Sequence, residues 1–365
     1  MLEDKAYTLI SSEARKHDPS GMLLHVIHTP HSVLESTRRY REEAESLLRF
    51  DFSRLSGVVV SGMGGSFISG LFLYDLIADK TDKPLVLNRD AKLPKFIDKN
   101  YLLVTVSYSG NTEETLRVYS EGLKRGIPIV AVTSGGKMAE ISEKKGVPLL
   151  RLPPGIPPRA AFPHITSALT SVLSLVTGID AVSWLEEAAR ELQSRLEGAF
   201  SEGAALARLL HEDVAKGLVP LVYGYSPYTS PAYRFKTQLN ENSKVHAFFG
   251  ELPEGNHNEI MGWSGPLANF SVIFLRGREE PEYMRARIEF LEELLSSKGV
   301  PYYNLYGEGG GRAGELLSLV FKADVASVAL ALLRGVDPTP VDIISRLKTH
   351  LESRVGLTFL REAER

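Results

Sequence analysis

Residues 104–115 have the sequence VTVSYSGNTEET, in which a short apolar run passes into a cluster of hydroxyl side chains. Residues 104–106, two valines around a threonine, end a mainly apolar run that predicts a buried strand, and Thr112 stands where a helix would begin. A phosphate monoester has three terminal oxygens to satisfy, and Ser107, Ser109 and Thr112 offer neutral donors beside the amides of a helix N-terminus. If Thr112 only capped the helix, one hydroxyl would suffice. The stretch therefore predicts a phosphate-binding loop.

A second glycine-rich loop stands earlier in the chain, where residues 58–66 read VVVSGMGGS. The three valines predict a buried strand, and Gly64, Gly65 and Ser66 form the turn into the next helix. Glycine lets the backbone approach a ligand closely. Phe67 stands where a dinucleotide fingerprint needs its third glycine, and the Lys-Ser or Lys-Thr ending of a nucleotide P-loop is missing. We expect this loop to contact the same ligand, and the alternative is a tight turn without one.

Short apolar runs alternate with polar segments of helix length through most of the chain. Such alternation predicts parallel sheets with crossover helices on both faces. The tract LPPGIPPR, residues 152–159, separates two such series, because adjacent prolines exclude regular structure. We predict an α/β protein with an N-terminal helical arm over residues 1–50, a first domain over 51–180, and a second domain with C-terminal helices over 181–365.

The composition limits the chemistry available to the chain. There is no cysteine among the 365 residues, so disulfides, thiolate nucleophiles and zinc–thiolate sites are excluded. His25, His28 and His31 recur at period three without clustered carboxylates, and we expect neither a metal nor a cofactor. A formal net charge of −3 argues against nucleic acid or an anionic membrane as a partner. The start of the sequence lacks a basic region followed by an apolar one, and we expect a cytoplasmic protein.

Together the two loops, GMGGS at 62–66 and SYSGNTEET at 107–115, resemble the sugar isomerase (SIS) domain, a flavodoxin-like α/β module that binds phosphosugars. Later segments narrow the resemblance: PPRAAFP (157–163), LNENSK (239–244), LPEGNHNE (252–259) and GVDPTP (335–340). With these the chain resembles, from about Val58 to His350, the bifunctional phosphoglucose/phosphomannose isomerase family of archaea and some bacteria. The resemblance implies two flavodoxin-like SIS domains, with the N-terminal arm outside it.

The resemblance implies a metal-independent isomerisation that interconverts glucose 6-phosphate or mannose 6-phosphate with fructose 6-phosphate through a cis-enediolate. Glu241, between two asparagines, is the candidate carbon acid/base, because a partly desolvated carboxylate can be tuned toward the working pH. Arg159, held by the proline tract, is a permanently charged donor suited to oxyanions developing at C1 and C2. His257 matches the family's ring-opening histidine, and a histidine side chain can both donate and accept a proton. The resemblance therefore implies a homodimer with each site completed by the other subunit's histidine.

Two further residues are assigned mainly by the resemblance. Lys348 matches the family's lysine near the ring oxygen of the substrate. Thr339 stands where the bifunctional enzymes carry a small hydroxyl residue, which leaves room for either epimer at C2. Residues 223–230 open the second half without the phosphate-loop pattern, so we expect one phosphate site per chain.

Two other functions compete with this interpretation. A non-catalytic phosphosugar-binding SIS regulator would keep the hydroxyl cluster but has no use for Glu241, Arg159, His257 and Lys348 together, and such regulators usually add a DNA-binding domain. Another isomerase or an amino-transferring enzyme would share the fold. Ammonia chemistry needs a glutaminase nucleophile, which a chain without cysteine does not supply.

Overall fold

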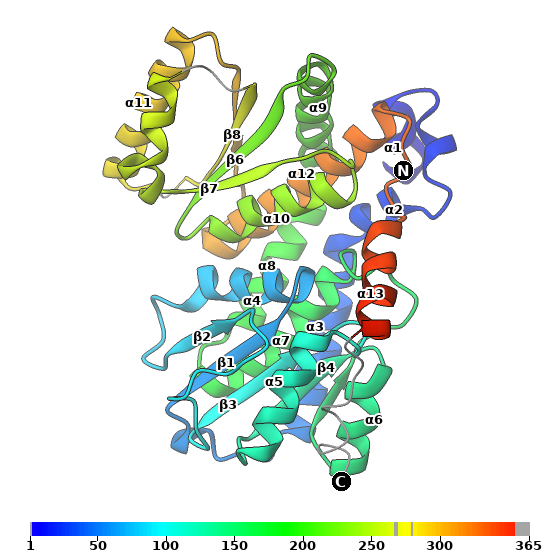
Figure 1. Ribbon diagram of the computed structural model, residues 1–365, viewed down its shortest axis with the longest axis vertical. Coiled ribbons are helices and arrows are strands. Elements are labelled where there is room, and N and C mark those ends of the chain that lie inside the picture. The colour runs from blue at the N-terminus through cyan, green and yellow to red at the C-terminus, as the bar shows by residue number, and fades with distance from the viewer. Residues whose placement is uncertain (1, 266–268, 279, 355–365) are drawn as a thin grey trace. The chain divides into compact units, whose positions relative to one another are not determined.

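The computed structural model describes residues 2–265, 269–278 and 280–354 (Figure 1). Contacts within the chain divide it into two units, each built around its own parallel sheet. The first-sheet unit consists of residues 31–186 and the segment from 341 onward, and the second-sheet unit of residues 1–30 and 187–340. Each unit thus draws on two separate stretches of the chain, and the division into domains at residues 50 and 180 stays a prediction.

The first sheet has five parallel strands in the order β2-β1-β3-β4-β5. They are β1 (Gly57–Gly62), β2 (Leu85–Asn88), β3 (Tyr101–Val106), β4 (Ile129–Thr133) and β5 (Leu149–Arg151). Val59 of β1 lies opposite Val86 of β2 on one side and Leu103 of β3 on the other. Because the strand order reverses between β1 and β3, a crevice is expected at their carboxyl ends, where open α/β sheets bind ligands.

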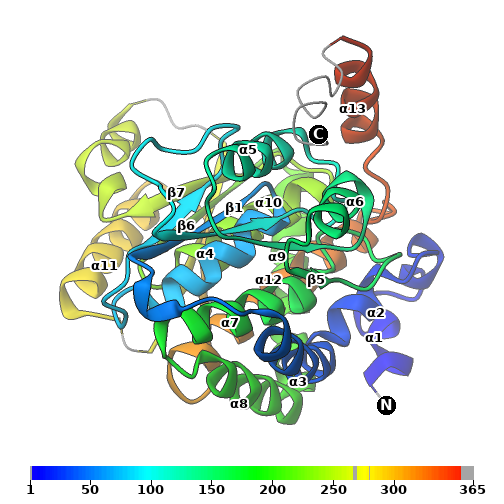
Figure 2. The same cartoon turned by 90° about the horizontal axis from the view of Figure 1, so that it is seen from below.

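Helices cover both faces of the first sheet (Figure 2). They are α4 (Gly65–Ile77), α5 (Glu113–Lys124), α6 (Gly136–Lys145) and α7 (Phe162–Thr177). On one face Leu103 and Ala131 of the strands share a buried cluster with Leu116 of α5 and Met138 of α6. On the other face α4 contacts β1 and α7. Strands buried on both faces need apolar residues at every position, which explains the uninterrupted runs in the sequence.

The second sheet has four parallel strands in the order β7-β6-β8-β9. They are β6 (Val219–Tyr225), β7 (Phe248–Leu252), β8 (Phe270–Arg276) and β9 (Tyr302–Tyr306). The accompanying helices are α8 (Ala181–Ser194), α9 (Leu196–Ala215), α10 (Thr229–Glu241), α11 (Glu282–Ser297) and α12 (Gly311–Leu333). Two parallel sheets flanked by helices confirm the predicted α/β fold.

Helix α12 forms the centre of the second-sheet unit and packs against α9 and α10. Of the helices that the structure describes, α12 alone is long and apolar enough to cross a membrane. However, 94% of its apolar window is buried within the protein. A helix that is apolar on all sides and covered by neighbouring elements is the usual core helix of a large domain.

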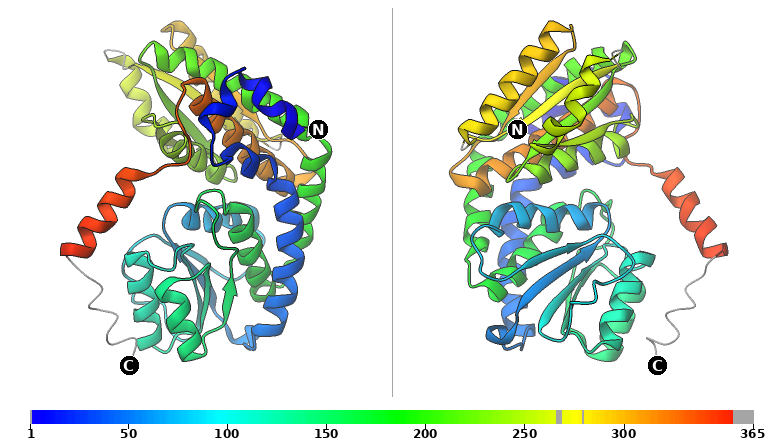
Figure 3. Two further views of the ribbon diagram at one scale, coloured as in Figure 1. Left: turned by 90° about the vertical axis from the view of Figure 1, so that its right-hand side faces the viewer. Right: turned by 60° about the vertical axis from the view of Figure 1, so that its left-hand side comes forward.

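The first part of the chain is helical, as predicted for the arm. It contains α1 (Leu2–Ile10), the short helix η1 (Ala14–His17), α2 (Met22–Ile27), α3 (Thr29–Leu47) and the short helix η2 (Phe52–Arg54). Both η1 and α2 contact α12 (Figure 3). Asp18 fixes the start of α2, because its carboxylate accepts hydrogen bonds from the amides of Met22 (2.7 Å) and Leu23 (2.9 Å). The arm is therefore an integral layer of the second-sheet unit as far as residue 30.

Candidate active site

The hydroxyl cluster that follows β3 converges as the sequence predicts. The Ser107 hydroxyl donates to Thr112 Oγ1 at 2.9 Å and accepts from the amide of Gly110 at 3.1 Å, while Ser109 Oγ accepts from the amide of Asn111 at 3.3 Å. Thr112 is the N-cap residue of α5, yet its side chain makes no capping bond to the helix amides. The alternative in which Thr112 serves only as a cap therefore does not describe this loop.

Gly110 gives the loop its shape. It adopts φ +67°, and a Cβ at this position would stand 1.8 Å from the carbonyl oxygen of Gly135. The loop that follows β4 supports it further: Ser134 Oγ donates to the carbonyl of Tyr108 at 2.6 Å, and the Lys137 amide donates to Asn111 Oδ1 at 2.9 Å. The 134–137 loop therefore fixes the backbone and side chains of the loop that carries the hydroxyl cluster.

The glycine loop after β1 lies beside Arg159, at the edge of the first sheet where the hydroxyl cluster follows β3. Gly64 (φ +53°) is the N-cap residue of α4. Gly65 lies close to the tract that carries Arg159: a Cβ added to Gly65 would stand 3.6 Å from the Pro158 carbonyl oxygen and 3.7 Å from Arg159 Cα. Arg159 is buried, with 4% of its surface exposed. A buried guanidinium next to a glycine loop and a helix N-terminus is a place where an anion would be stabilised strongly, since the local dielectric is low.

Tyr108, which the sequence analysis did not single out, connects the phosphate loop to the proline tract. Its hydroxyl donates to the Pro153 carbonyl at 2.8 Å and accepts from the Ile156 amide at 2.9 Å. Burial raises the pKa of Tyr108, so the hydroxyl keeps its proton and can donate near neutral pH. The tract that carries Arg159 is thus fixed to the loop that carries Ser107 and Ser109.

Lys348 lies on α13 (Asp342–Arg354), which belongs to the first-sheet unit. A hollow of about 550 Å³ is lined by Lys348 and by three apolar residues of α13, together with the outer side of the phosphate loop: Ser109, Asn111, Thr112, Glu113, Glu114 and Lys137. This volume lies within the range of small-molecule sites. The structure therefore places Lys348 beside the predicted phosphate loop, although the two are more than 230 residues apart in sequence.

Glu241 is the last residue of α10 in the second-sheet unit. The neighbouring asparagines fix the helix end: Asn240 Nδ2 donates to the Val245 carbonyl at 2.9 Å, and Asn242 Nδ2 donates to Ser327 Oγ at 3.0 Å. Asn242 is fully buried. Thr339 lies in the same unit, and its amide donates to Asp337 Oδ1 at 2.8 Å.

His257 ends the short helix η3 (Glu254–His257), which follows β7 and precedes η4 (Glu259–Ser264). Its side chain is exposed on the single chain. The adjacent Asn256 is different, because its Oδ1 atom is buried with no hydrogen-bond partner among the described residues. A buried acceptor without a partner is costly, and a ligand or a second chain would normally satisfy it.

The equivalent edge of the second sheet is filled by side chains. The Tyr228 ring occupies the space beside Gly277, where a Cβ would stand 1.8 Å from Tyr228 Cζ, and its hydroxyl bonds Glu315. Next to it Tyr225 donates to Glu280 Oε1 at 2.8 Å. This closed edge agrees with the expectation of one phosphate site, in the first sheet.

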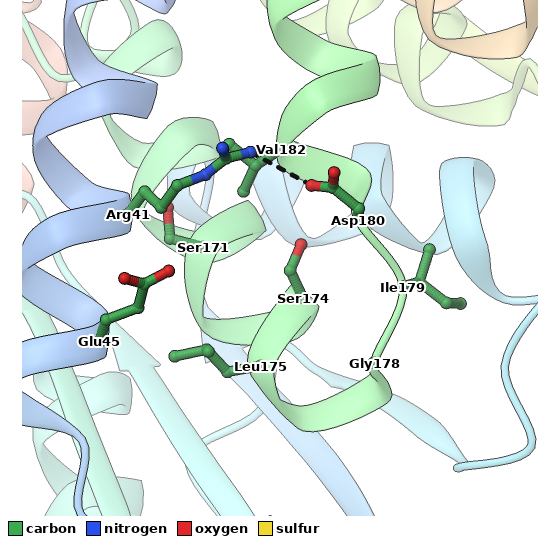
Figure 4. A pocket seen from close by; sticks show the side chains of 9 residues that line it. All are labelled: Arg41, Glu45, Ser171, Ser174, Leu175, Gly178, Ile179, Asp180 and Val182. Atoms are coloured by element: carbon green, nitrogen blue, oxygen red, sulfur yellow. Dashed lines mark hydrogen bonds and ion pairs between the residues drawn. The ribbon is translucent and has the colours of Figure 1, made fainter.

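A second hollow in the first-sheet unit contains none of the predicted site residues (Figure 4). Its volume is about 320 Å³, and an ion pair at 3.2 Å joins Arg41 to Asp180 there. It lies at the C-terminal end of α7, whereas Arg159 precedes the N-terminal end of that helix. A helix of 16 residues spans about 24 Å, so this hollow is separate from the phosphate loop.

Comparison with known proteins agrees with the fold. A family model described as bacterial phospho-glucose isomerase C-terminal SIS domain matches residues 203–351. A bifunctional phosphoglucose/phosphomannose isomerase of Aquifex aeolicus is 37% identical over 305 residues, which are 83% of this chain and 92% of that protein. A D-glucosamine-6-phosphate 4-epimerase of Sulfolobus acidocaldarius is 34% identical over 239 residues, 65% of this chain and 74% of that protein.

Among solved structures, a hypothetical protein of Thermus thermophilus has the same fold, with a TM-score of 0.74 at 17% identity over 97% of this chain and 95% of the other. With the SIS-type fold, these relatives identify the chain as a sugar-phosphate isomerase. Within that class the chain belongs to the bifunctional phosphoglucose/phosphomannose isomerase family. This confirms the family that the sequence motifs indicated.

Proposed function

We propose that the chain interconverts glucose 6-phosphate and mannose 6-phosphate with fructose 6-phosphate, without a metal or cofactor, through a cis-enediolate. The observation that carries the proposal is the junction of two segments in one unit. The Ser107–Thr112 hydroxyl pair stands at the N-terminus of α5, and Tyr108 connects this loop to the tract that ends in buried Arg159. Neutral hydroxyls, helix amides and one buried cation are the groups expected around a phosphosugar.

Each step of the reaction has a residue suited to it. Ring opening moves a proton from the C1 hydroxyl to the ring oxygen, which His257 performs together with Lys348. Glu241 then removes the proton at C2 and returns one at C1, and the hydroxyl proton on O2 passes to O1, while Arg159 stabilises the negative charge on the enediolate oxygens. Atoms balance without a co-reactant, because the ketose is an isomer of the aldose.

Dual specificity follows from the intermediate. Glucose 6-phosphate and mannose 6-phosphate differ only in configuration at C2, and loss of the C2 proton converts both to the same enediolate. The small side chain of Thr339 leaves room for the C2 hydroxyl in either configuration. The active unit in this proposal is a homodimer in the cytoplasm. The exposed His257 and the unsatisfied Asn256 oxygen beside it support completion of each site by a second copy.

The test measures fructose 6-phosphate formed from each aldose phosphate by the purified protein in EDTA. When the reaction is run in D₂O, proton transfer through Glu241 should introduce deuterium at the carbon that receives the proton. Glu241→Gln should abolish turnover, whereas the matched variant Glu251→Gln, at an exposed position on β7, should not change it. Loss of activity in EDTA would contradict the proposal, and so would inversion at C4 in place of isomerisation. Tight binding of fructose 6-phosphate without turnover would favour the regulator.

A further inference from the structure

Lys244 has an unusual backbone conformation close to Glu241. It is the only non-glycine residue with positive φ among the described residues, at φ +54°. A side chain with a Cβ seldom adopts this left-handed conformation, and glycine or asparagine is far more common there. Because strained residues persist only where their surroundings fix them, the contacts of Lys244 show what this conformation achieves.

The Lys244 ammonium bonds two backbone carbonyls from different parts of the second-sheet unit. Nζ donates to the carbonyl of Glu241 and, at 2.9 Å, to the carbonyl of Pro338. The first carbonyl belongs to the C-terminal end of α10, where a cation is favoured by the helix dipole. The second immediately precedes Thr339. One side chain therefore connects the proposed base to the segment proposed to accommodate the C2 hydroxyl.

The residue immediately before Lys244 is held by α12 and its C-terminal cap. Ser243 Oγ donates to the Ser327 carbonyl at 2.6 Å, and Arg334 donates to the Ser243 carbonyl. These bonds fix the chain where it leaves α10 and direct the Lys244 side chain back toward the helix end. The chain before Lys244 is thus fixed by α12, and the Lys244 ammonium joins the end of α10 to the segment that follows α12.

We infer that Lys244 is a positioning residue for the isomerisation: it holds Glu241 and Thr339 at a fixed separation across the C2 atom of the substrate. The inference rests on the proposed function. A displacement of about 1 Å between a base and its carbon can cost about 100-fold in rate. Loss of the ammonium should therefore lower kcat by about 10- to 100-fold and change KM by less than about threefold, because the phosphate is bound elsewhere.

The experiment compares Lys244→Met, which removes the charge, with Lys244→Gly, which also relieves the positive φ. Lys244→Arg retains a donor, and Lys216→Met serves as the control, because Lys216 is an exposed lysine that caps α9 in the same unit. Readouts are kcat and KM for glucose 6-phosphate, the melting temperature, and amide hydrogen exchange of residues 336–340. The glycine variant should melt no lower than the parent, lose kcat and exchange faster at 336–340, while the arginine variant recovers most of kcat.

The outcomes separate the positioning role of Lys244 from the proposed isomerase function. Parent-like kcat in the methionine and glycine variants, or unchanged exchange at 336–340, would overturn the positioning role of Lys244. A parent protein without isomerase activity would instead refute the proposed function, and the exchange measurement would still decide whether Lys244 fixes the 336–340 segment. A fall in kcat in Lys244→Gly that is matched by a lower melting temperature and by a similar fall in Lys216→Met would identify general destabilisation and also overturn the inference.

Discussion

Replacing Asp324 by leucine is expected to destabilise the second-sheet unit by about 3–5 kcal/mol. Asp324 on α12 and Arg234 on α10 are 3% and 1% exposed. Their side chains form two hydrogen bonds, Nε to Oδ1 at 2.9 Å and Nη2 to Oδ2 at 2.7 Å, and Gln238 adds a third to Oδ1 at 3.0 Å. The single substitution leaves the Arg234 charge buried without its carboxylate, and that uncompensated charge is the source of the cost.

The double variant Arg234→Met/Asp324→Leu gives the opposite expectation. Apolar side chains of similar volume remove both charges together, so the double variant should be more stable than Asp324→Leu alone. The exposed pair between Glu13 and Lys16 has the same 2.7 Å separation, and Glu13→Leu should leave stability nearly unchanged.

The assay is urea unfolding followed by the fluorescence of Trp263, which is buried in the second-sheet unit, in a Trp184→Phe background that removes the other tryptophan. A single reporter avoids averaging over two units that need not unfold together. The reasoning would be refuted if Asp324→Leu cost less than about 1 kcal/mol, or if the double variant were no more stable than the single one.

Three further expectations follow from the structure. Tyr108→Phe removes both bonds to the 152–158 tract and should cost about 1–3 kcal/mol, with a fall in kcat/KM; full activity in steady-state assays would show that the tract needs no such anchor. Gly110→Ala should prevent folding of the phosphate loop because of the 1.8 Å clash, whereas Gly126→Ala, at φ +64° with no atom within 4 Å, should cost only about 1 kcal/mol in thermal unfolding. Burial, followed by the charge of His28, lowers the pKa of His25 below 6.5, so the folded state resists protonation. The stability that His25 contributes is present above pH 6.5 and is lost as the pH falls below it; His25→Gln should reduce the drop in urea midpoint between about pH 7.5 and 5.5, and an unchanged drop would exclude this origin.

The sheets were predictable because parallel strands leave a strong signal in sequence. The run of residues 102–106 is apolar at every position except Thr105, since both faces of β3 are covered. The convergence of Ser107 and Thr112 was also predictable, because their spacing sets a turn between a strand and a helix. These relations are local in sequence, so they can be recognised without knowledge of the tertiary fold.

Contacts made through backbone carbonyls were not predictable. Tyr108 bonds the carbonyl of Pro153, 45 residues later, and Lys244 bonds that of Pro338, 94 residues later. Every residue carries a carbonyl, so no side-chain pattern marks the acceptor. The pair of Arg234 with Asp324 was missed for a related reason: neither helix carries a sequence pattern that marks the partner, and their register emerges only when α10 and α12 pack together.

The contact between α2 and α12 has a consequence for synthesis on the ribosome. The arm is made before α12, which is completed only at Leu333, about 300 residues after α2. At roughly 5–20 residues per second that interval lasts about 15–60 s. During it the apolar side chains of α2, such as Leu23 and Val26, have no partner helix, while residues 31–186 can already collapse around their own sheet. Burial of α2 against α12 therefore has to wait until most of the chain has been made.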